Sequence, residues 1–139
     1  MVKNISIQDP QADKGVMIKF KDGYFRQGRG ADDPEYQFGE IDRVVFGDLT
    51  GEGSNDAAII YWISAGTGKG YTACVLSGKN GKIIDYDGPY LGNSVEVKKF
   101  AIENKKLVID AIYGEKGNWG NPTHIKKSFV LKNNKIVSQ

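Results

Sequence analysis

The sequence has few of the residues that build disulfides and histidine-based sites. Of its 139 residues, one is cysteine and one is histidine. Cys74 has no partner for a disulfide within the chain, and its place in the apolar stretch Tyr71–Leu76 is typical of a small buried side chain. His124 is the only imidazole available to a nucleophilic triad or a metal site. Its alternation with Lys126 and Ser128 indicates a solvated strand face.

Long apolar runs and an excess of one charge are missing as well. No segment approaches the ~20 apolar residues of a membrane-spanning helix, so no membrane span is expected. Lysine and arginine total 19 against 17 acidic residues, a net charge of +2. This balance gives no general electrostatic case for nucleic acid or an anionic membrane. Residues 1–8 lack the apolar core of a secretory leader. Two readings stay open: a cytosolic protein, or an exported protein whose leader stands upstream of Met1.

Helical periodicity is nearly absent, and strand-like stretches separated by turn signals take its place. The 18 glycines divide the chain into short runs rich in Val, Ile, Tyr and Phe. We expect a single all-β domain over residues 16–139, preceded by a flexible N-terminal segment over residues 1–15. The predicted fold is an antiparallel meander of about 8–10 strands that forms a sandwich or a partly closed barrel.

The turn signals and apolar runs predict how the strands are arranged. Ala57–Ile63 is apolar on both alternating faces, which predicts an interior strand covered on both sides. Tyr71–Leu76 is expected to return antiparallel to it, and residues 29–39 are expected to form a loop. Turns are expected at four further places: Asp22-Gly23, Asn80-Gly81, Glu103–Lys105 and Asn133-Asn134.

The most informative stretch is the acidic, glycine-rich segment from Asp48 to Asp56. Its oxygen-bearing side chains stand at alternate positions, Asp48, Thr50 and Glu52, and again at Asp56. A backbone that curls around a hard cation turns alternate residues inward, so this spacing suits an oxygen-ligand Ca²⁺ loop. Gly53 occupies the sixth position, where such loops turn sharply and need a residue free to take positive φ.

The residues that flank this segment exclude the helical types of calcium loop. An EF-hand requires a bidentate Glu at the twelfth position and a helix on each side. Here that position is Ile59, inside a strand-like run, so the EF-hand and the dockerin type are both excluded. A metal-free interpretation stays open, in which the segment is a tight polar turn whose Asp and Ser side chains hydrogen-bond to their own backbone.

With Phe46-Gly47 before it, the segment resembles the FG-GAP loop of integrin-α-like β-propeller blades, where an Asp-rich, glycine-containing loop joins two strands. The resemblance implies five Ca²⁺ ligands: the side chains of Asp48, Thr50, Glu52 and Asp56, and the backbone carbonyl of Ser54. Thr50 and Glu52 stand where that family has Asp or Asn. The implied affinity is therefore weak, in the ~10⁻⁴–10⁻³ M range of extracellular modules.

A wider likeness extends beyond the loop. Five segments resemble parts of a group of small bacterial exported proteins with no established activity: Ile18–Tyr24, Asp42–Ala58, Tyr71–Leu76, Tyr90–Val95 and Leu107–Asp110. Asn93 stands where that group more often has Asp. The resemblance implies an extracytoplasmic location, periplasmic, cell-surface or secreted. Because a propeller needs several blades, it also implies a lone loop of this type on another β fold.

A second candidate site is the glycine-rich segment that carries Trp119 between Asn118 and Asn121. An aromatic ring in such a segment either folds back on the core or is displayed for contact with sugars or partner side chains. Trp62, by contrast, lies inside the two-sided apolar strand and is expected in the core.

Together these patterns favour a non-enzymatic, extracytoplasmic binding or accessory module with a weak structural Ca²⁺ loop and an unknown protein or glycan as partner. No catalytic residue is assigned, and no nucleic-acid partner is expected. One alternative is a glycan-directed hydrolase that uses Asp85, Asp87 or Asp110 as carboxylates, although Asp85–Pro89 more simply forms a turn. The other is a protein inhibitor or receptor that acts through the Trp119 segment.

Overall fold

The structure, a computed structural model, describes residues 6–8, 17–28, 30, 36–51, 53, 56–64, 68–76, 83–85, 90–93, 95–113, 123–132 and 135–139. These residues form twelve strands and no helix, so none of their segments is a helix long and apolar enough to cross a membrane. The strands are β1 (Ser6–Gln8), β2 (Met17–Lys19), β3 (Tyr24–Gln27), β4 (Gln37–Gly47), β5 (Asp56–Ser64), β6 (Lys69–Leu76), β7 (Ile83–Asp85), β8 (Tyr90–Asn93), β9 (Val95–Glu103), β10 (Lys106–Tyr113), β11 (Thr123–Lys132) and β12 (Lys135–Ser138).

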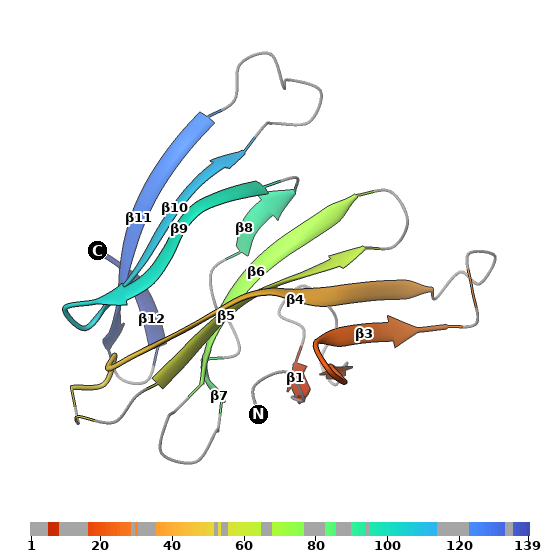
Figure 1. Ribbon diagram of the computed structural model, residues 1–139, viewed down its shortest axis with the longest axis horizontal. Coiled ribbons are helices and arrows are strands. Elements are labelled where there is room, and N and C mark those ends of the chain that lie inside the picture. The colour runs from red at the N-terminus through yellow and green to blue at the C-terminus, as the bar shows by residue number, and fades with distance from the viewer. Residues whose placement is uncertain are drawn as a thin grey trace.

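Two antiparallel sheets contain most of these strands (Figure 1). The six-stranded sheet has the order β3-β4-β5-β6-β7, with β8 paired to another part of β6. The four-stranded sheet has the order β12-β11-β10-β9, and β1 and β2 form a separate two-stranded sheet. The predicted all-β, antiparallel class is confirmed. The two larger sheets face each other across a shared core, as in a sandwich, and the described strands form no closed barrel.

The six-stranded sheet is buried on both faces because apolar residues alternate to both sides of β5. Ala58 and Ile60 face the four-stranded sheet and pack with Leu107, Ile109 and other inward residues of that sheet. Ala57, Ile59 and Tyr61 face the opposite side. The predicted two-sided strand is thus confirmed, and β6 returns antiparallel to it as expected. Cys74 and Trp62 are also buried, as predicted.

The N-terminal part of the chain covers this opposite face. Ile18 and Phe20 are almost fully buried there, and the ring of Phe20 meets that of Tyr61 edge-on at 5.5 Å. The Asp22-Gly23 turn forms as predicted, with positive φ at both residues and a bridge between Lys21 and Tyr24. The hairpin does not continue, however, because β2 pairs with β1 and crosses over the sheet instead of pairing with β3.

The two large sheets are tied together where β4 passes β9. Each strand has a register shift at this point, next to Arg43 in β4 and between Asp110 and Ala111 in the pairing of β9 with β10. The Arg43 guanidinium donates a 3.0 Å hydrogen bond to the carbonyl of Val97 across the gap between the sheets. Further along, Gly47 lies so close to Ile102 that a β-carbon would come within 2.6 Å of its methyl group.

Two features differ from the sequence-based expectation. The strand β4 begins at Gln37, inside residues 29–39, because Gln37 pairs with Gln27 and the neighbouring Phe38 ring packs edge-on against Trp62. The described residues also contain twelve strands instead of about 8–10, and β1, β7 and β8 have only three or four residues each. Strands this short contain too few alternations for a pattern to be recognised.

Candidate functional site

The acidic loop joins β4 to β5, and the pair Gly47–Asp56 closes it. Asp56 opens β5 and is only 1% exposed. One of its carboxylate oxygens, Oδ2, accepts hydrogen bonds from the backbone N–H groups of Leu49 at 2.8 Å and Thr50 at 3.1 Å. The carboxylate thereby orders the start of the loop from the interior of the protein. The side chain of Leu49 packs into the core.

Asp48 orders the rest of the loop from the solvent side. Its Oδ1 accepts the backbone N–H of Gly51 at 2.8 Å and the hydroxyl of Thr50 at 3.4 Å. Its Oδ2 accepts the backbone N–H of Gly53 at 2.9 Å. Gly51 and Gly53 adopt φ of 81° and 83°, so the expected positive φ at Gly53 is confirmed. Only a residue tolerant of this region can direct its amide at Asp48 without strain.

These bonds keep the Asp48 carboxylate ionised. The N–H of Gly53 contributes most to lowering the pKa of Asp48 below its ordinary value, desolvation opposes the shift, and Gly51, Thr50 and the charge of Lys105 lower it further. The Lys105 side chain lies beside the loop, within 3.6 Å of the position that a β-carbon of Gly51 would take. The loop therefore presents a fixed negative charge, with Lys105 as a nearby cation.

The donor set of the loop fits a hard cation in chemical type. Asp48, Thr50 and Asp56 supply oxygen atoms, the ligands that Ca²⁺ prefers, and Glu52 and Ser54 lie outside the described residues. A carboxylate has about four lone-pair positions; Asp48 uses three of them in the bonds above. Among the described residues no group of three or more His, Cys, Asp or Glu side chains gathers at one point.

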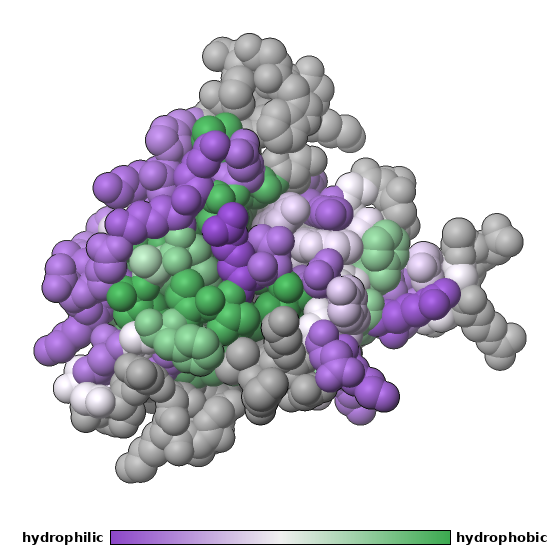
Figure 2. All heavy atoms as spheres, viewed as in Figure 1, coloured by the Kyte–Doolittle hydropathy of each residue, from purple (hydrophilic) through white to green (hydrophobic). Residues whose placement is uncertain are grey.

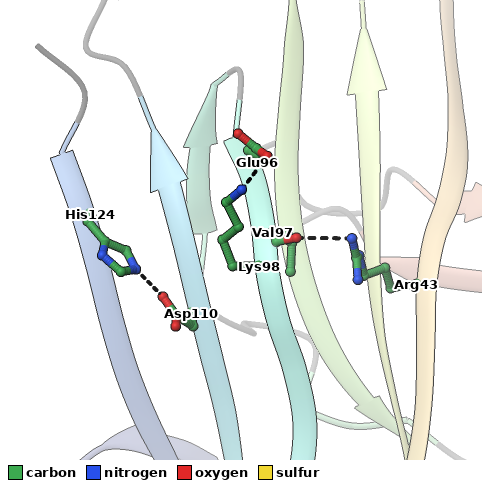
Figure 3. Close-up of polar contacts among 6 residues, drawn as sticks. All are labelled: Arg43, Glu96, Val97, Lys98, Asp110 and His124. Carbon is green, nitrogen blue, oxygen red and sulfur yellow. Dashed lines mark hydrogen bonds and ion pairs between the residues drawn. The ribbon is translucent and has the colours of Figure 1, made fainter.

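A second polar cluster lies on the outer face of the four-stranded sheet (Figure 3). His124 of β11 contacts the Asp110 carboxylate of β10 through Nε2, and 61% of the imidazole side chain is exposed. His124 is therefore on the surface, as predicted. The residues opposite Asp110 on the two neighbouring strands are Lys99 and Lys126. The alternation along β11 indicated the face of His124, but no local pattern indicates which residue lies across from it.

An aromatic row on the six-stranded sheet was not predicted. Phe38 stands edge-on to Trp62, with ring centres 5.8 Å apart, and tilts against Tyr36 at 5.6 Å. The Lys69 ammonium lies over the Trp62 ring at 4.2 Å and Arg26 lies over Tyr36 at 5.6 Å. The rings and cations thus cover one another, which makes the row a stabilising element of this half of the sheet.

The remaining candidates lie outside the part of the chain that the structure describes. These are Asp87 and the Trp119 site with Asn118 and Asn121. The Trp119 segment connects β10 to β11, whose last described pair is Tyr113–Thr123. The strand ends that this segment connects, Tyr113 and Thr123, therefore lie next to His124. Asp85 ends β7 in the six-stranded sheet, so it is on a different sheet from Asp110.

Comparison with known proteins adds no relative to this description. No family model matches the chain, and neither the curated proteins nor the solved structures contain a match.

Proposed function

We propose that this chain is a non-enzymatic binding or accessory module that works outside the cytoplasm. The observation that carries the proposal is the use of its carboxylates. Asp48 and Asp56 hold the β4–β5 loop through backbone amides, and Asp110 lies on an open sheet face beside His124. Asp48 and Asp56 thus stabilise the scaffold, and Asp110 lies on its surface. The extracytoplasmic location rests on the resemblance to small bacterial exported proteins.

The hydrolase alternative is less well supported by the surroundings of Asp110. Glycoside hydrolysis generally requires two carboxyl groups about 5–9.5 Å apart on either side of the scissile bond. The residues directly across from Asp110 are lysines, Lys99 and Lys126, and the carboxylate already contacts His124. A lysine on each side suits ion pairing on a surface better than acid–base attack on a sugar.

Polysaccharide digestion separates the module from the hydrolase. The chain is incubated with neutral and acidic polysaccharides, and newly formed reducing ends are measured. A binding module releases none, with wild-type chain and Asp110→Asn giving the same background. Release by the wild type that Asp110→Asn abolishes would contradict the proposal and support the hydrolase. Asp42→Asn, which removes a carboxylate from β4, serves as the control.

We propose in addition that the β4–β5 loop binds Ca²⁺ weakly as a structural ion. Asp48, Thr50 and Asp56 would hold it, together with Glu52 and the carbonyl of Ser54. A bound Ca²⁺ supplies positive charge that neutralises the carboxylates and stiffens the connection between two core strands. In the absence of the ion the amide bonds to Asp48 and Asp56 already give the loop its shape, which reduces the entropy lost when an ion binds.

Thermal unfolding with millimolar Ca²⁺ tests this loop. Because a ligand that binds only the folded state stabilises it, the melting temperature is expected to rise by a few degrees, about 2–4 °C at a concentration a few times the dissociation constant. Asp48→Ala should abolish the rise, and the same concentration of Mg²⁺ should give less. Exposed Asp42→Ala, in β4, should keep it. No rise for the wild type would disprove the calcium site.

A further inference from the structure

The proposed binding module has a surface whose chemistry identifies a partner. We propose that the apolar surface at the junction of β4 and β9, together with the lysine-rich four-stranded sheet beside it, docks onto an anionic lipid membrane. This inference rests on the proposed function, because it specifies what the module binds. It concerns peripheral contact with the membrane surface only.

The apolar part of this surface is centred on the C-terminal half of β4. Phe46 is 62% exposed, the highest value for a phenylalanine in the described residues. Val44, two residues earlier on the same strand face, is partly exposed, and so are Ala101 and Ile102 of β9. Figure 2 shows a continuous hydrophobic surface over these parts of β4 and β9. Exposed contiguous apolar surface with a polar border is typical of an interaction site.

This surface is continuous because β4 and β9 touch closely. Gly47 follows Phe46 directly and lies against the Ile102 side chain. At the other end of the contact, Arg43 bonds to the carbonyl of Val97. The side chains between these two contacts are therefore held side by side on a rigid pair of strands. A preformed apolar surface loses little conformational entropy when it is covered.

The charge of the neighbouring sheet favours an anionic partner. Residues 95–139 contain nine lysines and four acidic residues, whereas residues 1–94 contain more acidic than basic residues. The small net charge of the whole chain therefore conceals two regions of opposite sign. Residues 95–139 supply all four strands of the smaller sheet, so the positive region is one sheet of the sandwich. Figure 2 shows hydrophilic surface bordering the apolar surface over β9–β11.

Pairing within the sheet leaves lysines in excess. Glu96 is paired with Lys98 at 2.8 Å, and Asp110 contacts His124 (Figure 3). Glu103 is paired with Lys99 at 2.6 Å. Among the described residues no carboxylate lies within 4.0 Å of Lys106 or Lys132. These two lysines border the turns at the end of the sheet where β4 also ends. The nearby Asp48 charge is held by loop amides and by Lys105.

These properties favour a lipid surface over the other occupants. A second copy of the chain would bring two positively charged sheets together, which costs electrostatic free energy. A soluble anionic polymer would engage the lysines and leave Phe46 in water. Lipid headgroups attract lysines, whose flexible stems lie along apolar surface, and the boundary below the headgroups accepts an aromatic ring. Only the membrane satisfies both halves of the surface.

Vesicle co-sedimentation tests the proposal, with phosphatidylcholine vesicles compared with mixed phosphatidylcholine–phosphatidylglycerol vesicles. The buffer contains EDTA, so that the calcium loop plays no part. The wild type should bind the mixed vesicles, less so at high salt, and should not bind pure phosphatidylcholine. Lys106→Gln/Lys132→Gln should weaken binding about 25-fold, since each lysine near an anionic surface contributes about fivefold. Phe46→Ser should weaken it about tenfold.

Matched controls separate docking from a general loss of charge or apolar surface. Tyr24 is exposed to the same degree as Phe46, at 63%, but lies on β3. Lys19, which ends β2, and Lys21 are exposed lysines away from the four-stranded sheet. Tyr24→Ser and Lys19→Gln/Lys21→Gln should bind as the wild type does. Circular dichroism is measured for every variant to check that it is folded.

Several outcomes would overturn the docking proposal. They are a wild type that ignores the mixed vesicles, controls that lose as much as the test variants, and Phe46→Ser binding at full strength. Binding to dextran sulfate but not to vesicles would assign the lysines to a polymer instead. A chain that fails these tests yet keeps its Ca²⁺ response and lacks hydrolase activity would retain the proposed function, so the two failures can be distinguished.

Discussion

At the scale of single residues, two carboxylates maintain the β4–β5 loop by different means. Asp56 is buried and accepts two amides, and hydrogen bonds to a charged group contribute about 1.5–3 kcal/mol each. The same bonds compensate the desolvation of its charge. Asp48 accepts the amides of Gly51 and Gly53 nearer to solvent. The loop is therefore held on both sides of its backbone. Loss of either carboxylate would remove the acceptor of two of these four amides.

The lowered pKa of Asp48 predicts a pH-dependent stability. Its folded-state pKa is below the ordinary value of 3.8 because Gly53 and then Gly51 donate to the ionised form. The stabilisation is therefore complete above that ordinary value and is lost as the pH falls through the folded-state pKa. We expect the urea midpoint to fall on acidification below pH 3.8, with a shallower fall for Asp48→Asn. Equal slopes for the two proteins would contradict the assignment, since all other carboxylates are common to both.

At the scale of the elements, the β4–β9 contact joins the two sheets at two points. The Arg43–Val97 hydrogen bond lies where both strands are irregular in register, and β-bulges of this kind re-aim side chains and bend strands. At the other point, the missing side chain of Gly47 allows Ile102 to approach the backbone. Both contacts are tertiary, because they connect residues more than fifty positions apart.

A substitution at Gly47 tests the second of these contacts. Gly47→Ala would place a methyl group 2.6 Å from Ile102 Cγ2, and overpacking of this kind costs about 1–3 kcal/mol. Ile102→Ala removes the Cγ2 methyl group and leaves the β-carbon of residue 102 at 2.7 Å. The clash is thereby relieved in part, so the double variant should lose somewhat less stability than the sum of the single variants. Urea unfolding of all four proteins gives the coupling free energy.

Gly39 provides the matched control for that cycle. A β-carbon at Gly39 would clash with the backbone oxygen of Trp62 and lie 2.6 Å from the Ile63 side chain. Truncating Ile63 to Ala cannot move the backbone oxygen, so Gly39→Ala should remain destabilising in its presence. Equal coupling free energies for the Gly47–Ile102 pair and the Gly39–Ile63 pair would contradict a specific contact between Gly47 and Ile102.

At the scale of the whole molecule, one sheet separates two hydrophobic clusters. The first lies between the two large sheets, and the second lies between the six-stranded sheet and the N-terminal residues Ile18 and Phe20. Because β5 contributes alternate side chains to both clusters, loss of either cluster exposes one face of the same strand. The two clusters should therefore unfold together, as expected for a small single domain.

Equivalent truncations in the two clusters test this coupling. Ile18→Ala and Ile109→Ala each remove a side chain that is at most 3% exposed, and each should cost about 2–5 kcal/mol. Both should leave one urea transition with an unchanged slope. A second, earlier transition in Ile18→Ala alone would show that the N-terminal cover detaches independently of the sandwich.

The local features of the fold could be predicted because each one is encoded within a few consecutive residues. The alternation in Ala57–Ile63 predicted a two-sided strand, and Asp22-Gly23 predicted a turn, which forms with positive φ at both residues. Gly53 was likewise assigned a positive φ from its place in the acidic loop. Burial of Cys74 and exposure of His124 followed from the composition of their strands.

Only the tertiary structure decided which distant residues meet. The contact of Asp110 with His124 depends on the register of β10 against β11. If either strand slipped by one residue, its side chains would move to the other face of the sheet and the contact would be lost. The one-residue register shifts in β4 and β9, beside the hydrogen bond from Arg43 to Val97, likewise have no local signal.

The sequence by itself determined an all-β chain, the turns at Asp22-Gly23 and Glu103–Lys105, and a strand-to-strand acidic loop, because backbone preference and alternation act over short distances. The tertiary structure decided that Asp48 and Asp56 each accept two backbone amides of the loop. It also decided that the excess lysines lie on one sheet, the four-stranded sheet, and that the apolar β4–β9 surface lies beside that sheet. Side chains far apart in the sequence share a surface only once strand order and register are set, and so charge that is balanced over the chain becomes separated in the folded protein.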